Sequence, residues 1–294
     1  MTIELFTVGQ CATLACRWEA SVAKPGNVHP GANFEDLTFD DLLSAADAIG
    51  TPMDLAAIRP LGATVLDSVR ATHDVTGTNA NLGLILLIAP LAKVPRNVAL
   101  DRGVREILDA LTIEDAEHVY EAIRLAQPGG MGGVESQDVA RSPSIGLVEA
   151  MRMAADRDLV AAQYANGFRE VLASAAPWIL EGTARGWSID DAIVHAHLRL
   201  MRAFPDSLIA RKCGKEVARK SAVRAESTLA SGEPGDAAYR KALYDFDVWL
   251  RADGHRRNPG TTADMIGAAL FALLRDGLLN GSGSLCNLEI DRND

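Results

Sequence analysis

Residues 5–36 read LFTVGQCATLACRWEASVAKPGNVHPGANFED. The first part, residues 5–22, has apolar side chains at helical spacing and predicts an amphipathic helix. This helix is expected to end near Lys24, because Pro25 cannot continue a helix and pushes the residue before it toward extended geometry. The polar stretch 19–36 holds a lysine, an imidazole, two amides and three acids. That composition is more typical of a built site than of a linker.

The same alternation of apolar helix and polar break repeats along the chain. Residues 82–93 could be a buried strand or a buried helix, and their length and neighbours favour a helix. PGGMGG (128–133) opens an uncertain loop that runs to Pro143, and SGEPGD (231–236) is a second break. Helices are expected over residues 5–22, 38–48, 60–72, 82–93, 96–111, 112–127, 144–155, 159–184, 188–203, 206–226, 237–252 and 262–279.

No β-hairpin signature, alternating strand series or internal repeat is present in the sequence. The chain is therefore predicted to be a single all-α domain over residues 1–294. We expect a multi-helix bundle of about ten helices, with polar active-site loops at the helix boundaries. The Gly/Ser/Asn-rich tail 280–294 is expected to fray.

Composition and charge exclude several classes of function. The 294 residues are 48% hydrophobic but only 5% aromatic, which suits an Ala- and Leu-rich helical core. A formal charge of −10 argues against a nucleic-acid partner. The longest apolar run, 82–92, is too short to span a membrane and contains Pro90. No signal-peptide pattern is present, and Cys11, Cys16, Cys213 and Cys286 are scattered, so we expect a cytoplasmic protein with reduced thiols.

Four irregular polar segments lie beside apolar helices: 19–36, HDVTGTNANLG (73–83), PDSLIARKCGKE (205–216) and HRRNPGTTAD (255–264). Helix N-termini suit phosphate oxygens, although Thr261 or Thr262 could simply cap the following helix. Arg211 and Lys212 share an expected helix with Lys215, Arg219 and Lys220. That surface could bind phosphate, or it could be a solvated face paired with nearby glutamates.

Acidic and imidazole side chains offer two further interpretations. Glu19, Asp36 and Asp264 are candidate ligands for Mg²⁺, with phosphate oxygens completing the shell. The dipeptide His73-Asp74 instead suggests a helical metal phosphohydrolase, although such dipeptides are common. No P-loop, G-x-S-x-G or dinucleotide fingerprint is present.

Taken together, the motifs resemble those of the triphosphoribosyl-dephospho-CoA synthase family, an all-helical family of transferases. The resemblance covers most of the chain, and its strength lies in the order and spacing of the motifs. They are EASVAKPGNVH (19–29), GANFED (31–36), IRPLG (58–62), TNANLG (78–83), PDSLIARKCG (205–214) and NPGTTADM (258–265).

The resemblance implies a Mg²⁺-dependent enzyme that moves a triphosphoribosyl group from ATP to the 2′-hydroxyl of 3′-dephospho-CoA and releases adenine. Its partners would be these small molecules, with no nucleic acid or membrane, and a homodimer is compatible with it. By position, Asp36, Glu19 and Asp264 would serve as metal ligands or catalytic groups. Residues that would contact the nucleotide or its phosphates are Lys24, Gly26, Asn27, His29, Asn33, Asn79, Asn81, Arg211, Lys212 and Asn258.

Three positions depart from the family pattern. Asn81 and Leu82 stand where many members carry His and Lys, and Asn33 replaces another His. The loss of a cation and two imidazoles leaves the acceptor open. An ATP-dependent ribosyl-phosphate transfer to another cofactor precursor, such as a methanopterin-type one-carbon carrier, is one alternative. A catalytically silent helical binding protein is another.

Overall fold

The computed structural model describes residues 6–128 and 141–285, and this part of the chain is helical with no strand. The first half comprises α1 (Val8–Ser21), α2 (Phe39–Ala48), α3 (Gly50–Asp54), α4 (Leu61–Thr76), α5 (Leu82–Lys93), α6 (Leu100–Asp109) and α7 (Ile113–Ala126). The second half comprises α8 (Leu147–Ala154), α9 (Leu159–Asn166), the π-helical turn η1 (Val171–Ala175), α10 (Ala176–Ala184), α11 (Ile189–Ala203), α12 (Ser207–Cys213), α13 (Lys215–Ala230), α14 (Ala237–Arg251) and α15 (Gly260–Arg275).

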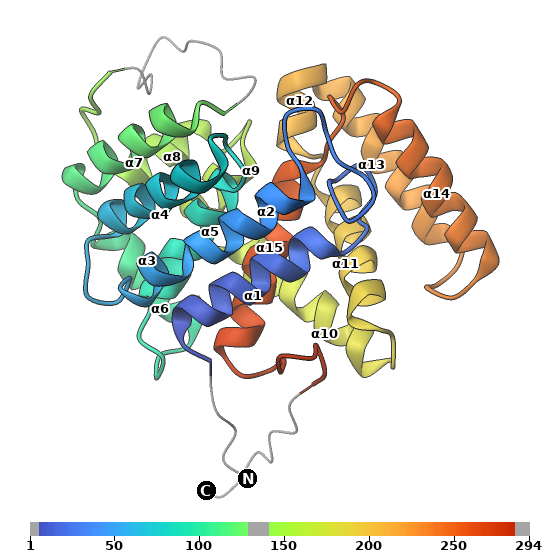
Figure 1. Cartoon of the computed structure of the whole chain (residues 1–294), viewed down its shortest axis with the longest axis horizontal. Coiled ribbons are helices and arrows are strands. Elements are labelled where there is room, and N and C mark those ends of the chain that lie inside the picture. Colours follow the sequence, from blue (N-terminus) through green and yellow to red (C-terminus); the bar gives the residue numbers. More distant parts are fainter. Residues whose placement is uncertain (1–5, 129–140, 286–294) are drawn as a thin grey trace, which may run out of the picture.

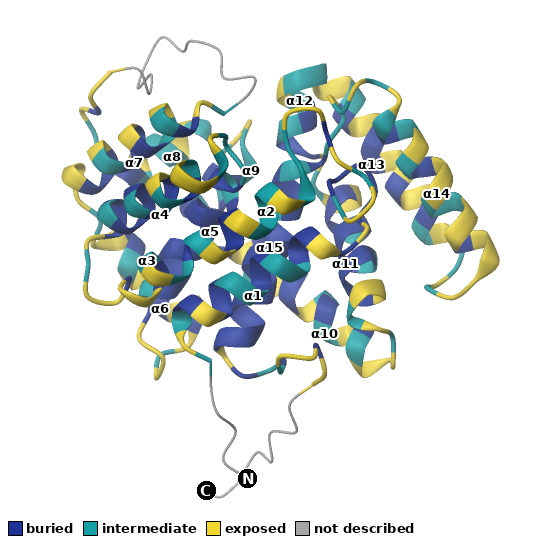
Figure 2. Ribbon diagram, in the orientation of Figure 1, coloured by how far each residue is buried: buried dark blue, intermediate teal, exposed yellow. Residues whose placement is uncertain are grey.

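Helices α5 and α15 form the centre of the molecule. Nearly all residues of α15 are buried, as are those of α5 from Leu84 to Ala92. Helices that are apolar all round must be enclosed by others, and both lie in the dark-blue interior of Figure 2. One continuous hydrophobic core joins them to the surrounding helices. The prediction of an all-α fold is confirmed, including the helical choice for residues 82–93.

Local signals set where several helices begin. Thr7, Thr38 and Thr112 each accept a hydrogen bond from the backbone of the third helical residue, whose own side chain bonds back. These reciprocal capping boxes satisfy amide groups that would otherwise lack partners at the start of α1, α2 and α7. In the box at Thr38, Asp41 stands in place of the usual Glu or Gln.

The helices are more numerous than the expected ten or so, because two long predicted helices are broken. Residues 159–184 divide at Gly167 and Phe168, both with positive φ (74° and 62°). Residues 206–226 divide at Gly214 (φ 92°), which separates α12 from α13. The short helix α3 was not predicted. The predicted loop over 128–143 and the tail 280–294 lie mostly outside the described residues.

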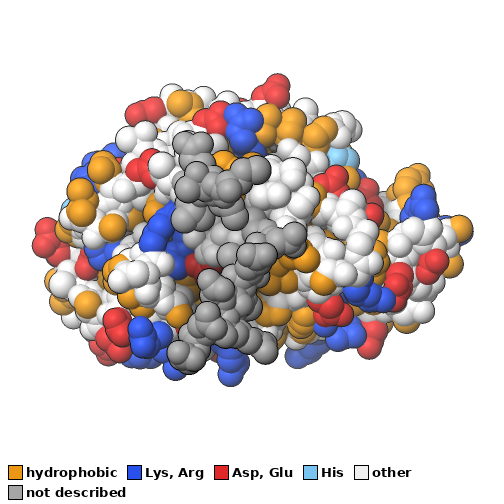
Figure 3. Space-filling view, turned by 90° about the horizontal axis from the view of Figure 1, so that it is seen from below, with side chains coloured by type: hydrophobic (Ala, Val, Ile, Leu, Met, Phe, Trp, Pro, Cys, Tyr) orange, Lys and Arg blue, Asp and Glu red, His pale blue; other side chains and the backbone are white. Residues whose placement is uncertain are grey.

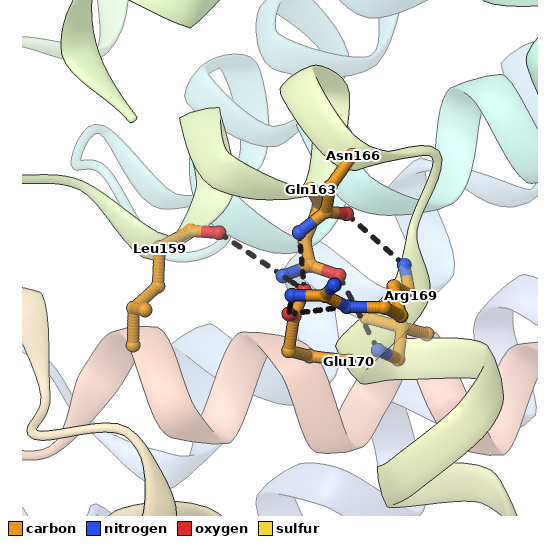
Figure 4. Close-up of polar contacts among 6 residues, drawn as sticks. Leu159, Gln163, Asn166, Arg169 and Glu170 are labelled. Carbon is orange, nitrogen blue, oxygen red and sulfur yellow. Dashed lines mark hydrogen bonds and ion pairs between the residues drawn. The ribbon is translucent and has the colours of Figure 1, made fainter. Parts of the chain in front are cut away.

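A buried polar network fixes the turn at Gly167. The Glu170 carboxylate accepts hydrogen bonds from Gln163 Nε2 (2.9 Å), Asn166 Nδ2 (2.6 Å) and Arg169 Nη2 (2.9 Å). Figure 4 shows these side chains converging on Glu170 from both sides of the turn. Burial raises the pKa of Glu170, but the donated hydrogen bonds outweigh it and the net pKa is lowered. The turn between α9 and η1 therefore depends on an ionised carboxylate.

The helices form two flanks around the central pair. Helices α4, α7 and α8 lie on one flank, and α12, α13 and α14 on the other (Figure 1). Figure 3 views the molecule from below, where basic and acidic side chains are interspersed and neither sign dominates. Among the described residues, no helix has both the length and the hydropathy needed to cross a membrane.

Candidate active site

A cavity of about 1850 Å³ opens between the two flanks. It is lined by the loop at residues 34–37, the start of α5, parts of α7 and α8, the starts of α9, α12 and α15, and one face of α13. Drug-sized ligands usually occupy pockets of roughly 300–1,000 Å³, so this cavity has room for two nucleotide-sized molecules. All four polar segments singled out in the sequence reach the cavity, and the segment 19–36 does so only through its last residues.

Seven of the predicted site residues line the cavity, and they come from positions far apart in the sequence. They are Asp36, Asn79, Asn81, Arg211, Lys212, Asn258 and Asp264. The other six predicted residues do not line it: Glu19, Lys24, Gly26, Asn27, His29 and Asn33.

Asp264 lies in the first half of α15 and reaches the beginning of α5. A β-carbon at position 83 would overlap its carboxylate, so Gly83 is what allows this approach. Burial raises the pKa of Asp264 well above its ordinary value, and the charges of Glu19, Asp206 and Asp158 add to the rise. Arg211 acts in the opposite direction. No hydrogen bond to the Asp264 carboxylate occurs within the described residues, so its oxygens are available to a ligand.

Hydrogen bonds join the starts of three helices beside Asp264. Asp206 caps α12 through Leu208 N (2.8 Å) and Ile209 N (2.9 Å), and its second oxygen accepts from both N and Oγ1 of Thr262 at 2.8 Å. Ser207 Oγ contacts Thr261 Oγ1 at 3.1 Å and accepts from Leu159 N, the first residue of α9. The segments 205–216 and 255–264 therefore meet.

A cationic wall forms the α12–α13 side of the cavity, consisting of Arg211, Lys212, Lys215 and Arg219. Arg211 pairs with Asp158 at 3.3 Å, whereas no carboxylate of the described residues lies within ion-pair distance of the other three. The turn at Gly214 places Arg211 and Lys212 on one helix and Lys215 and Arg219 on the next. Lys220 does not line the cavity, and its ammonium lies 3.9 Å from Glu216. Four cations facing one cavity in an acidic protein suit a polyphosphate.

Lys24 occupies an environment that its sequence context did not reveal. Its side chain is completely buried, and its ammonium lies 3.0 Å from Glu19 Oε1 and donates to the carbonyls of Glu19 and Val22. Because these partners use its hydrogen-bonding capacity, the structure does not bring Lys24 to a ligand in the cavity. Glu19 likewise pairs with Lys24 and does not line the cavity, although its charge acts on Asp264.

The rest of the 19–36 loop is anchored rather than exposed to the cavity. Gly26 has a φ of 78° and donates to Asp247 of α14 at 2.7 Å, and Arg251 donates to the Asn27 carbonyl at 2.6 Å. Asn27 Nδ2 also donates to Asn258 Oδ1 at 2.8 Å. His29 contacts the carbonyl of Pro30. The loop is pinned at residues 26–27, and only its end at residues 34–37 reaches the cavity.

The asparagines of the second segment serve the structure of the cavity wall. Asn79 Oδ1 accepts from Leu82 N (3.2 Å) at the start of α5. Asn81 is buried, accepts from Thr72 Oγ1 (3.0 Å) and donates to the Ala45 carbonyl (3.3 Å). Asn33, the third departure from the family pattern, is exposed and accepts from Phe39 N. Asn81 and Leu82 therefore form a mainly structural part of the cavity wall.

His73 lines the cavity but Asp74 does not. A metal phosphohydrolase would need further ligands beside this pair. Among the described residues, no group of three or more His, Cys, Asp or Glu side chains is placed to hold a metal ion. Mg²⁺ that is bound mainly by phosphate oxygens needs only one or two protein carboxylates, and the cavity offers Asp36 and Asp264.

Sequence reasoning missed several residues that the cavity brings together. Gly83 was part of a quoted motif, yet its role depends on a helix from the other end of the chain. Asp158 was detectable only as an N-cap before an apolar helix, and it belongs to none of the quoted motifs. His255 and Phe34 also line the cavity, with their rings 4.1 Å apart.

Comparison with known proteins identifies relatives. A family model described as ATP:dephospho-CoA triphosphoribosyl transferase matches residues 6–282. A crystal structure from Archaeoglobus fulgidus, described as a candidate triphosphoribosyl-dephospho-CoA synthase, superposes with a TM-score of 0.62 and 26% sequence identity. The match covers 80% of this chain and 99% of the other. No protein with a curated description matches the chain significantly.

Proposed function

The chain belongs to the ATP:dephospho-CoA triphosphoribosyl transferase family, and from that membership we propose that it transfers the triphosphoribosyl group of ATP to the 2′-hydroxyl of 3′-dephospho-CoA and releases adenine. The observation that carries this proposal is the placement of the cationic α12–α13 wall and the Asp264 carboxyl in one large cavity. The cations suit a triphosphate that is retained in the product. The carboxyl suits chemistry at a ribose carbon.

The cationic wall would hold the triphosphate as a handle. In this reaction the phosphoanhydride bonds stay intact, so the contacts position the ribose rather than assist a leaving phosphate. Lys212, Lys215 and Arg219 have no carboxylate partner among the described residues and are free to receive phosphate oxygens. Arg211 would be shared between Asp158 and the ligand.

Asp264 is the residue we assign to the reacting centre. The glycosidic C1′–N bond breaks and the 2′-oxygen of the acceptor forms a new bond to C1′, while adenine leaves with the bonding electrons. Positive charge that develops on the ribose is stabilised by a nearby carboxylate. The hydroxyl proton would pass to the ionised form of Asp264, which is a stronger base than an ordinary aspartate because its pKa is raised, and then to the departing adenine, which is released neutral.

Mg²⁺ is proposed as the partner of the triphosphate. Asp36, with an exposed carboxylate at the cavity, would hold the ion together with phosphate oxygens. Such an ion supplies charge neutralisation for the triphosphate. Glu19 does not line the cavity, so we assign it no direct contact with the ion. Its role would be to pair with the buried Lys24.

Product analysis tests the proposal. Purified protein is incubated with ATP, Mg²⁺ and 3′-dephospho-CoA, and the mixture is separated by chromatography and identified by mass spectrometry. We expect adenine and a triphosphoribosyl adduct of the acceptor in equal amounts. ADP or inorganic phosphate as the sole ATP-derived products would contradict the proposal.

The departures at Asn81 and Leu82 favour one alternative within the same chemistry. Leu82 lines the cavity where many family members have a lysine, so the acceptor could lack an anionic group at that point. Supplying a methanopterin-type precursor in place of dephospho-CoA distinguishes the two acceptors. Adenine release with the methanopterin-type precursor but not with dephospho-CoA would identify that precursor as the acceptor.

A further inference from the structure

The lining of the cavity changes in character from one flank to the other. Every charged residue that α12 and α13 contribute is a cation. By contrast, every residue that α7 and α8 contribute to the described lining is uncharged, including Ile123, Leu147, Ala150, Met151 and Met153. Figure 1 shows the two helix pairs on opposite flanks of the molecule. One cavity therefore presents two surfaces with different ligand preferences.

The charged residues of α7 and α8 are directed elsewhere. Glu121 pairs with Arg70 at 2.6 Å, and neither Glu149 nor Arg152 lines the cavity. Met153 does line it and is 47% exposed, so its side chain is accessible to a ligand. Methionine side chains are flexible and adapt to ligands of irregular shape. We call this surface, formed by Ile123, Leu147, Ala150, Met151 and Met153, the apolar wall.

We infer that the apolar wall binds the uncharged pantetheine arm of the acceptor, 3′-dephospho-CoA. This inference rests on the proposed function. If the triphosphate of ATP occupies the cationic wall and its ribose lies at Asp264, the acceptor must reach Asp264 from another direction. The arm of the acceptor is long, flexible and without charge, so its burial against methionine and aliphatic side chains is favourable.

The position of Arg157 agrees with this direction. Arg157 lies on the connection between α8 and α9, between Met153 and Asp158 in the sequence, and it lines the cavity. Its guanidinium donates to the Met153 carbonyl at 3.0 Å, and its nearest carboxylate, that of Asp156, is 3.9 Å away. A loosely paired cation at this place suits the diphosphate that joins the arm to the adenosine of the acceptor.

Calorimetric titration of the full chain tests the inference with three ligands: dephospho-CoA, ATP and ADP, which has no pantetheine arm. Met153→Glu places a charge on the apolar wall, and Arg152→Glu adds the same side chain one position away, where it does not line the cavity. We expect Met153→Glu to weaken dephospho-CoA binding about tenfold or more, because a carboxylate would be desolvated by the arm. Its affinity for ATP and ADP should stay within about twofold of the wild type, and Arg152→Glu should leave all three unchanged.

Met151→Ala trims the same wall without adding charge, and should weaken dephospho-CoA alone by about threefold even if the first variant folds poorly. Equal losses for all three ligands would overturn the inference, since the wall would then receive a nucleotide base. Unchanged dephospho-CoA binding in both variants would overturn it too, as would a wild type that does not bind dephospho-CoA. If the variants lose affinity for dephospho-CoA alone, but the wild type releases no adenine from ATP, the arm site would be supported and the proposed reaction contradicted.

Discussion

The carboxylate of Asp264 on α15 lies against Gly83 of α5 so closely that a β-carbon at position 83 would overlap it. This contact joins residues 181 positions apart and sets the direction in which Asp264 faces the cavity. The glycine is therefore required by a neighbour from the far end of the chain, and not by its own backbone conformation.

Gly83→Ala should displace the Asp264 carboxylate and lower kcat by about 100-fold, because small misplacements of a reacting group have large effects on rate. Steady-state adenine release measures this change. Gly146→Ala is the matched control, since nothing lies within 4 Å of a β-carbon there. A Gly83→Ala enzyme with full activity would show that the placement of Asp264 is unimportant.

Lys215→Ala and Arg219→Ala should each raise the KM for ATP about tenfold, because each removes one cation from the wall that is assigned to the triphosphate. The increase should shrink at high ionic strength, where exposed charges are screened. Lys220→Ala provides the control on the same helix, because Lys220 does not line the cavity. Equal effects from Lys220 and Lys215 would point to the overall charge of α13 instead of a site.

Lys24→Met should lower the free energy of unfolding by about 3–5 kcal/mol, because it leaves the buried Glu19 carboxylate without its partner. The double variant Glu19→Gln/Lys24→Met should recover part of this loss. Urea unfolding of the two single variants and the double variant measures both effects. A Lys24→Met protein of normal stability with a greatly raised KM for ATP would return Lys24 to the phosphate-binding role predicted from its motif.

Glu170 gives the fold a pH dependence. Its pKa is lowered in the folded protein from an ordinary value of 4.5, so the carboxylate contributes stability above that pH and loses it as the pH falls through the folded pKa. Glu170→Gln should cost about 1–3 kcal/mol at pH 7. Unfolding measured from pH 7 down to pH 3 should show the two proteins converging in acid. A difference that stays constant with pH would rule out this ionised network.

Much of the fold could be predicted because its signals are local. The capping threonines, the prolines and the apolar spacing place most helices without knowledge of the tertiary structure. The breaks at Gly167 and Gly214 could not be placed, because a single glycine inside a helical pattern is often tolerated. Only the network around Glu170 and the turn into α13 show that these glycines adopt positive φ.

The candidate site was predictable in part for a similar reason. Asp264, Arg211 and Asn79 lie in polar segments at helix boundaries, and such boundaries meet at one end of a bundle. Lys24 illustrates the limit, since a lysine before Pro-Gly reads as a solvent-facing cation. Its burial depends on how the loop folds back over the end of α1, and that closure is fixed by Asp247 and Arg251 of α14.

The most direct measurement compares adenine release from ATP by the wild type and by Asp264→Asn, with and without 3′-dephospho-CoA. We expect the wild type to release adenine only when the acceptor is present. Asp264→Asn should fold normally, bind ATP and release adenine at least about 100-fold more slowly, because the amide cannot accept the hydroxyl proton. Undiminished adenine release by Asp264→Asn, or adenine formation independent of any acceptor, would contradict the assignment of Asp264 to the transfer.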